Sequence, residues 1–500
     1  METKTNETNG NGMKKFKKIV ILDSVIFYPE HRKILSNLAE TIEEYPSSLP
    51  ENLERQYEEN PDLFKNKKCY TQIAADNIPL QLLMNRCEGA EVIISCWTNI
   101  PDEIIKLNKQ LKLIIFWTHE KEHRTNIKLV EERGITVCNI PDYGTDSVSE
   151  VVFAGLLTLI KRNFSKENPE NSEEVALGVM QKIFEKYRLL GKNEKETRRG
   201  QFLHHFHKLG MVKFNITEEN LSQVIHERLI ENKNLGIIGK SAELDYLETI
   251  AKKAFGMIVR RFSISNSDLA DYYKFLAENE VIVLDSSELE GLEFEKIKKL
   301  CNWKIIDIKE MNGLKYNLKN KQFGILGLGR IGERVAKIAK ELGVSLVYYS
   351  KTRRKNLEKS IGIKYLGLDK LLKTSDIISL HLPAHKADNL LSKEKLSLIK
   401  EGAIFINTSD GNIVDQKFLT ELMLNKKIYA FLDVYPGLPR KDVLGIEMTD
   451  QKDWKIKELL KEHVLTYRSG WKTQESVRVK TYKLLGQMID YLLKGVENAS

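Results

Sequence analysis

The sequence is poor in cysteine, contains no long apolar run and has no strong excess of charge of one sign. Its five cysteines show neither metal-ligand spacing nor an even disulfide framework, which favours a reducing, cytoplasmic setting. No stretch approaches the roughly 20 apolar residues of a membrane-spanning helix. The net charge of +8 comes from 78 basic and 70 acidic residues that are spread widely, so it gives no argument for binding nucleic acid.

The chain is long enough for several cores. Five hundred residues with 42% hydrophobic content suit two to four domains. Residues 1–12 are polar and lack the apolar segment of a secretory signal, so we predict a disordered tail there.

A glycine turn is the most informative motif. The apolar run 323–326 leads into Gly327-Leu328-Gly329-Arg330-Ile331-Gly332, and a helical pattern of apolar residues follows from Val335. In a strand, turn and helix of this kind the first glycine allows the tight turn, the second lets the backbone approach a pyrophosphate, and the third brings helix against strand. The segment therefore predicts a dinucleotide site, with the alternative of a glycine-rich turn in another α/β unit.

The segments around this turn resemble the D-2-hydroxyacid dehydrogenase family in order and spacing. His381-Leu382-Pro383 ends an apolar strand, residues 404–415 are similar to the family's Asn-x-x-Arg-Gly-x-x-Val-Asp segment, and Leu432-Asp433-Val434-Tyr435 is similar to its Leu-Asp-Val-Phe. Residues 89–162 resemble the family's outer domain and crossing helix. The resemblance implies a cleft between two α/β domains. It also implies that His381, Pro383, Thr408 and Asp433 contact the dinucleotide, and that Val148, Thr408, Ser409, Asp433 and Ser469 lie near the nicotinamide.

All three catalytic positions that the resemblance implies are substituted. The family's carboxylate-binding Arg falls on Asp410, its Glu falls on or near Leu438, and its general acid/base His falls on Arg468. Losing a general acid/base costs about 10²–10⁴-fold in rate. A guanidinium stays protonated throughout the working range, so Arg468 does not replace a histidine in that role.

Two interpretations of this exchange stay open. In the first the site has decayed, and Asp410 and Arg468 neutralise one another as an ion pair. In the second their roles are exchanged, with Arg468 anchoring an anion and Asp410 acting as base. We favour decay because two inverted charges must also be correctly aimed for catalysis.

The coenzyme type is indicated by the residues after the second strand, 344–349. NAD users carry an acidic residue about 20 residues beyond the glycines, whereas a nearby basic residue accommodates the 2′-phosphate of NADP. This chain has Ser350-Lys351-Thr352-Arg353-Arg354 there. We therefore predict NADP(H) over NAD(H), with Ser350 and Arg353 or Arg354 as phosphate partners. The alternative is that the three cations form an ordinary solvated turn.

The glycine segment has a faded copy upstream. Asn232 to Gly239 parallels Asn320 to Gly327, and Ile250-Ala251-Lys252 parallels Ile338-Ala339-Lys340, at a constant offset (324 − 236 = 88 and 338 − 250 = 88). Such self-similarity predicts a duplicated βαβ unit. The copy lacks the later glycines, having Ser241 and Leu244 there, so we expect it to hold no nucleotide.

These patterns predict an α/β chain with a flavodoxin-like outer domain and a Rossmann nucleotide-binding domain, with a degenerate Rossmann-like module inserted between them. We expect the outer domain over 13–162, completed by a C-terminal helix over 473–495. A helical link over 163–212, the module over 213–311 and the Rossmann domain over 312–472 make up the rest. If relatives dimerise through their nucleotide domains, as the resemblance implies, the module takes a partner's place in a monomeric pseudo-dimer; the alternative is a homodimer.

Two groups of histidines are candidate metal ligands. His119 and His123 are spaced i, i+4 and would be ligands if that stretch is helical, with solvated histidines as the favoured alternative. Residues 204–207 read His-His-Phe-His but have no Cys or acidic partner at a helpful spacing, so we predict no metal. The basic cluster 192–199 in the link is a candidate surface for a protein partner. The family's C-terminal-binding-protein corepressors are similar in carrying a Trp at the position of Trp471. The alternative is that Trp471 is simply a core residue.

The sequence thus favours an NADP(H)-binding member of this family that lacks dehydrogenase activity and has a sensing or scaffolding role. The alternative is an active NADP(H)-dependent oxidoreductase whose rearranged site acts on an unknown carbonyl or 2-hydroxyacid-like ligand.

Overall fold

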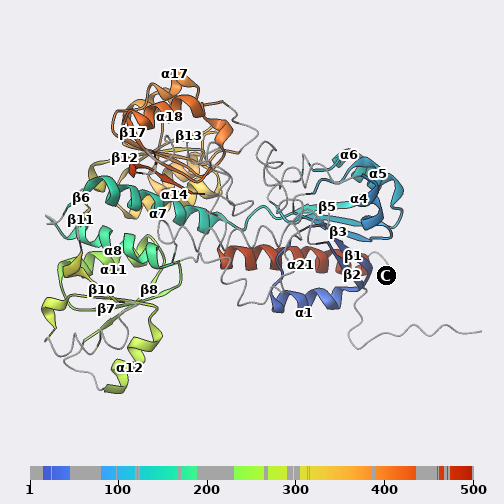
Figure 1. Cartoon of the computed structure of the whole chain (residues 1–500), viewed down its shortest axis with the longest axis horizontal. Helices are drawn as coiled ribbons and strands as arrows, with labels where there is room; N and C mark the ends of the chain where they lie inside the picture. The colour runs from blue at the N-terminus through green and yellow to red at the C-terminus, as the bar shows by residue number, and fades with distance from the viewer. Residues whose placement is uncertain are drawn as a thin grey trace, which may run out of the picture.

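The structure is a computed structural model that describes three parallel sheets and the helices around them. The described residues are 15–23, 25–45, 80–96, 98–118, 121, 124–166, 171–187, 230–263, 269–289, 297, 305–311, 313–314, 316–383, 387, 389–434, 459, 461–466, 470 and 473–497. The predicted α/β class is confirmed, because three parallel sheets carry helices along their faces (Figure 1).

The outer domain is a five-stranded parallel sheet in the order β2-β1-β3-β4-β5, which is the flavodoxin-like order. Its strands are β1 Phe16–Ile21, β2 Ala39–Glu44, β3 Val92–Ser95, β4 Leu113–Phe116 and β5 Thr136–Asn139, and its helices are α1 Pro29–Leu38, α4 Leu80–Cys87, α5 Asp102–Leu107 and α6 Ile127–Glu132. The central strands β3 and β4 are buried along their whole length, as expected for parallel strands covered on both faces.

The C-terminal helix completes this domain. Helix α21, Gln474–Glu497, corresponds to the helix expected at 473–495 and packs beside α1 (Figure 1). Its buried residues Val477, Leu484, Leu485, Met488 and Leu492 share one core with the face of β1, β3 and β4. The outer domain is therefore built from both ends of the chain.

The nucleotide domain is a seven-stranded parallel sheet, β14-β13-β12-β15-β16-β17-β18. Its strands are β12 Gln322–Leu326, β13 Ser345–Tyr349, β14 Lys364–Tyr365, β15 Ile377–Leu380, β16 Ala403–Asn407, β17 Ile428–Leu432 and β18 Val464–Leu465. Its helices are α14 Arg330–Glu341, α15 Lys355–Ile361, α16 Leu368–Thr374, α17 Lys393–Leu396 and α18 Gln416–Leu424. The order reverses between β12 and β15, and such a reversal is where open parallel sheets bind ligands.

A third, four-stranded parallel sheet has the order β10-β9-β7-β8. Its strands are β7 Asn234–Ile238, β8 Ile258–Phe262, β9 Val281–Leu284 and β10 Ile305–Asp307, with helices α11 Ala242–Lys253 and α12 Leu269–Glu278. The strands before and after this sheet in the chain lie side by side, because β6 Ser165–Lys166 pairs antiparallel with β11 Gly313–Leu314.

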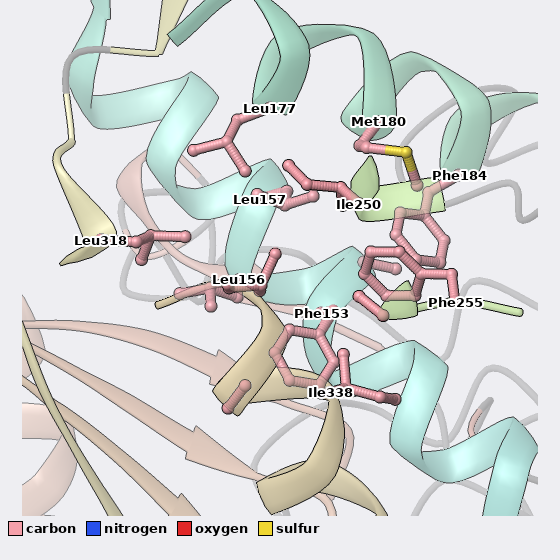
Figure 2. Close-up of a cluster of buried hydrophobic side chains, with 14 of the residues drawn as sticks. Phe153, Leu156, Leu157, Leu177, Met180, Phe184, Ile250, Phe255, Leu318 and Ile338 are labelled. Carbon is pink, nitrogen blue, oxygen red and sulfur yellow. The ribbon is translucent and has the colours of Figure 1, made fainter. Parts of the chain in front are cut away.

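Two helices lie between the third sheet and the nucleotide domain. Helix α7, Thr145–Phe164, and helix α8, Ser172–Tyr187, form the layer that joins them (Figure 1). In this layer the ring centroids of Phe184 and Phe153 lie 5.1 and 5.9 Å from that of Phe255, and Leu177 and Ile338 belong to the same core (Figure 2). Within the predicted helical link 163–212, α8 is thus a core helix, and the basic cluster 192–199 lies outside the described residues.

Short 3₁₀ turns complete the elements: η3 Ser286–Glu288, η5 Ile308–Glu310, η6 Leu318–Asn320 and η8 Gly411–Ile413. In the described parts of the chain, no helix is both long and apolar enough to cross a membrane.

Candidate functional site

The site begins at the glycine turn between β12 and α14. Gly327 has φ +97°, and an added Cβ there would lie 2.3 Å from the His381 carbonyl oxygen. A Cβ on Gly332 would lie 2.1 Å from the Gly327 carbonyl oxygen. Both positions therefore require glycine, one for conformation and approach and the other for packing of the helix.

Gly329 differs from the other two glycines. It is exposed, precedes the first residue of α14, and an added Cβ would meet nothing within 4 Å. The fold itself places no demand on glycine here, so the open space beside it is available for a ligand. The first amide groups of a helix have no partner within the helix and attract anions. Open space beside free helix amides is what a pyrophosphate site requires.

Two buried polar atoms at the carboxyl ends of β15 and β16 also lack partners. His381 bonds Ser379 Oγ through Nε2 at 2.8 Å, but no described residue offers a partner to its buried Nδ1. Thr408 Oγ1 is likewise buried without a partner among the described residues. Burial lowers the pKa of His381 to about 3, so the ring is neutral. Unpaired buried polar groups are costly, and a bound ligand that supplies their hydrogen bonds removes that cost.

The other predicted residues of the turn lie as follows. Arg330 donates from Nη2 to the Pro141 carbonyl oxygen at 3.0 Å, so its side chain leaves the turn towards the outer domain. Ile331 is half-buried and packs on the core. Pro383 is exposed beyond β15. Of these three, Arg330 takes a place that the sequence did not predict.

The end of β13 carries no carboxylate over 350–354, as the sequence showed. Ser350 donates to the Thr352 carbonyl oxygen at 2.6 Å, and the exposed Arg354 donates its backbone amide to Tyr348 Oη at 2.7 Å. Arg353 is bound elsewhere: it forms two hydrogen bonds of 2.8 Å with Glu358. These bonds and one from Tyr348 lower the pKa of Glu358 to about 2. The sequence prediction did not include Glu358 as a partner of Arg353. The signal for this pair was an acidic residue five positions after Arg353.

Asp410 follows β16 and is held in a local turn. Its Oδ1 accepts a hydrogen bond of 2.9 Å from the Asn412 amide, and so begins the 3₁₀ turn η8. The buried Asn407 holds the backbone there, donating to the Asp410 carbonyl oxygen at 2.9 Å and accepting from the Ser409 amide at 2.9 Å. Ser409 Oγ in turn donates to the Leu380 carbonyl oxygen of β15 at 2.7 Å. The role of Asn407 was not foreseen.

Asp433, at the end of β17, ties three segments together. Its carboxylate accepts from Thr466 Oγ1 at 2.5 Å and from the Gly470 amide at 3.0 Å. Ser147 of α7 donates to the Gly470 carbonyl oxygen, and a Cβ on Gly470 would lie 3.3 Å from Val148 Cγ2. Asp433 thus holds Thr466 and Gly470 in place close to α7. The predicted positions Arg468, Leu438, Ser469 and Trp471 lie outside the described residues, as do His119, His123 and 204–207.

Comparisons with known proteins agree with this geometry. Residues 294–448 match the family model described as the NAD binding domain of D-isomer specific 2-hydroxyacid dehydrogenases. A glyoxylate reductase of Thermococcus litoralis is 44% identical over 128 residues, which cover 25% of this chain and 39% of that protein. Residues 294–448 therefore belong to the NAD-binding domain of the D-isomer-specific 2-hydroxyacid dehydrogenase family.

Other family members give the same result. A glyoxylate reductase of Korarchaeum cryptofilum is 37% identical over 150 residues, covering 30% of this chain and 45% of its own. The aligned parts span less than half the length of either of these two curated relatives.

The fold of the whole chain is similar to solved dehydrogenases of the family. An NAD-complexed D-isomer specific 2-hydroxyacid dehydrogenase of Lactobacillus delbrueckii ssp. bulgaricus gives a TM-score of 0.51 at 15% identity, covering 96% of this chain and 98% of its own. A D-lactate dehydrogenase of Aquifex aeolicus, in complex with NAD and lactic acid, gives 0.50 at 19% identity, covering 96% of each. At these identities the similarity concerns the fold.

Among the described residues, no group of three or more histidine, cysteine or acidic side chains is placed to hold a metal ion.

Proposed function

We propose that this chain binds NADP(H) and has lost the family's dehydrogenase activity, so that it acts as a nucleotide-dependent sensor or scaffold. The family binds nicotinamide dinucleotides, and the preference for the phosphorylated form is our inference. The observation that carries the proposal is the turn after β16. There the carboxylate of Asp410 is used to cap η8, at the position where the resemblance expects a substrate-binding arginine.

The cofactor fits the residues that are present. The open space at Gly329 and the first amides of α14 would take the pyrophosphate. The unpaired Nδ1 of His381 and Oγ1 of Thr408 would take hydrogen bonds from the rest of the molecule. A bound NADPH supplies a hydride in enzymes of this kind; everything else has to come from the chain.

The preference for NADP(H) rests on the charges after β13. An acid there would bind the ribose 2′-hydroxyl and repel a 2′-phosphate, and residues 350–354 contain none. Lys351 and Arg354 are exposed cations, and Ser350 is a short hydroxyl at the strand end. Because Arg353 is paired with Glu358, we assign the phosphate to Ser350, Lys351 and Arg354 first.

The chemistry is proposed to be lost because no described side chain replaces it. An aspartate at 410 repels a substrate carboxylate, and losing a charge-assisted hydrogen bond costs about 1.5–3 kcal/mol. An arginine at 468 donates hydrogen bonds but does not exchange protons near neutral pH. Together with the loss of a general acid/base, these changes lower the rate by several decades.

A second candidate is an active reductase with exchanged roles. It is favoured by the reductase names of the relatives that are 37–44% identical over the nucleotide domain. In that case Arg468 binds an anionic substrate and Asp410 acts as a base, on a carbonyl compound of the 2-ketoacid type.

One titration distinguishes the two candidates. Purified protein is titrated with NADPH and NADH by fluorescence and calorimetry, and then mixed with glyoxylate, pyruvate and larger 2-ketoacids while oxidation of NADPH is followed. Tight NADPH binding without oxidation supports the proposal. Oxidation that disappears in Asp410→Asn establishes the second candidate, and NADH binding tighter than NADPH refutes the coenzyme preference.

A rescue experiment tests what was lost. Asp410→Arg combined with Arg468→His and Leu438→Glu restores the residue types that the resemblance expects. Ketoacid reduction by this triple variant, with none in Asp410→Arg alone, shows that the cleft survived and only its chemistry disappeared.

A further inference from the structure

We infer that the third sheet and its helices are an internal second copy of the nucleotide-binding unit, related to the first by a pseudo-two-fold axis through the α7–α8 layer. The chain thereby carries its own partner, and no second chain docks on that face of the nucleotide domain. This inference does not depend on the proposed function.

The two units superpose element by element along the sequence. Strands β7 and β12 and helices α11 and α14 start and end at the same offset (322 − 234 = 88 and 330 − 242 = 88). The strand order β10-β9-β7-β8 repeats the order β16-β15-β12-β13. Six buried pairs at this offset lie in one shared core: Ile230 and Leu318, Leu235 and Phe323, Ile237 and Ile325, Leu247 and Val335, Ile250 and Ile338, and Ala251 and Ala339.

A glycine is repeated for the same reason in both units. A Cβ on Gly236 in β7 would lie 2.7 Å from Phe275 of α12, and a Cβ on Gly324 in β12 would lie 2.4 Å from Ser375 Oγ and 2.8 Å from Leu371 of α16. In each unit the helix that leads to the strand beside the first one, α12 before β9 and α16 before β15, therefore packs directly on the first strand. Unrelated α/β units have no reason to share this detail at the same position.

The two helices of the central layer are also copies of one another. Five identities fall at a constant offset (172 − 149 = 23): Ser149 and Ser172, Glu150 and Glu173, Val152 and Val175, Gly155 and Gly178, and Ile160 and Ile183. Helix α7 packs on α14, helix α8 packs on α11, and α7 packs on α8. Each unit thus brings its own layer helix to the contact (Figure 1).

The contacts across this layer are reciprocal, as a two-fold axis requires. Arg334 of α14 pairs with Glu231 at 3.0 Å. The equivalents of these residues, at the offset of 88, are Tyr246 of α11 and Lys319, and Lys319 Nζ lies 5.0 Å from the Tyr246 ring centre. The same two positions are therefore in contact in both directions.

A glutamate from each of the two layer helices contacts the opposite unit. Glu150 of α7 accepts hydrogen bonds from the Ile230 and Glu231 amides, at 2.9 and 3.1 Å. Glu173 of α8 pairs with Lys319 Nζ at 3.1 Å. Because Glu231 and Lys319 are equivalent positions, each unit contacts the other unit's layer helix at the same position.

The internal copy has closed its own nucleotide turn. Glu288 Oε2 accepts from the Lys240 amide at 2.7 Å, beside the start of α11. A Cβ on Gly239 would lie 2.8 Å from the Leu244 side chain and 3.3 Å from the same Glu288 oxygen. A carboxylate of the chain stands where the open turn at Gly329 leaves room for a phosphate, so we expect one nucleotide per chain.

The test uses the intact chain. Equal amounts of ¹⁴N- and ¹⁵N-labelled protein are mixed, left to exchange, and coupled with a carbodiimide, which joins lysine to glutamate at contact distance. Peptides joining Lys319 to Glu173 are then analysed by mass spectrometry. The Lys252–Glu248 pair, at 2.5 Å within α11, is the positive control, and Glu173→Gln is the matched negative control.

We expect Lys319–Glu173 peptides of one isotope only and a solution mass of 57.7 kDa by light scattering. Mixed-isotope peptides, or a mass of two chains that persists on dilution, would overturn the inference. So would the absence of Lys319–Glu173 coupling while the control pair is coupled.

Discussion

Replacing the three glycines of the turn with alanine separates the fold from the binding site. In Gly329→Ala the new Cβ meets nothing within 4 Å, and the backbone, with φ −84° and ψ −164°, is extended and open to alanine. Alanine is a poorer residue than glycine before a helix by about 0.5–1 kcal/mol, and the stiffer unfolded chain returns about 0.4–1 kcal/mol. The stability of this variant should therefore equal that of the wild type within about 0.5 kcal/mol.

Binding should change much more. The added methyl group fills the space that we assign to the pyrophosphate, and displacing that group from the helix amides removes at least one charge-assisted hydrogen bond. That loss is about 1.5–3 kcal/mol, or roughly a 10- to 150-fold weaker Kd for NADPH.

Gly332→Ala is the contrasting variant. Its Cβ would lie 2.1 Å from the Gly327 carbonyl oxygen, so the helix has to shift, at a cost of about 1–3 kcal/mol in stability as well as binding. Gly367→Ala is the matched control, since it is also open and also precedes a helix. Thermal melts and NADPH titrations of the three variants check this. Wild-type affinity in Gly329→Ala would refute the assignment of the phosphate site.

Two further predictions concern charge. Glu358→Gln releases Arg353, so NADPH affinity should rise relative to NADH, more at low than at high salt; an unchanged ratio in paired titrations would show that Arg353 does not reach the 2′-phosphate. His381 and His463 are neutral in the fold because burial lowers the pKa of each, to about 3 for His381. The unfolded state then binds more protons below pH ~6.5, so stability should fall as the pH drops below that value, by at most about 1.4 kcal/mol per pH unit from His381 and in the same direction from His463. Urea unfolding between pH 7.5 and 5 checks the sign, and a profile that rises towards acid contradicts it; His463→Gln should flatten the slope.

The elements that the sequence predicted are those with local causes. The glycine turn was predictable because φ and close approach restrict Gly327 and Gly332 to one residue type. The buried strands were predictable from uninterrupted apolar runs such as Val92–Ser95 and Leu113–Phe116. The repeat at an offset of 88 was visible because the buried side of each unit must be filled by similar residues in a similar order.

The side-chain partners were less predictable because they depend on residues that meet only in the fold. Arg330 reaches Pro141, which is 189 positions away, and Asp433 meets Gly470, which is 37 positions away. The sequence predicts Arg353 or Arg354 as a phosphate ligand because both lie in a basic segment, yet the fold brings Glu358 close enough to pair with Arg353. Propensity and spacing describe the backbone well, whereas the direction of a long charged side chain is decided by which opposite charge the fold brings near it.

The turn after β16 shows how a site can lose chemistry and keep its frame. Its backbone is held by Asn407 and by the bond from Ser409 to β15, and neither uses the side chain at 410. The Asp410 carboxylate caps the Asn412 amide, a hydrogen bond of about 1 kcal/mol. An arginine at this position would lose that cap and leave Asn407 and Ser409 in place. Selection for binding alone would preserve this frame and release position 410, which is why we expect Asp410→Arg to fold and to keep its affinity for NADPH.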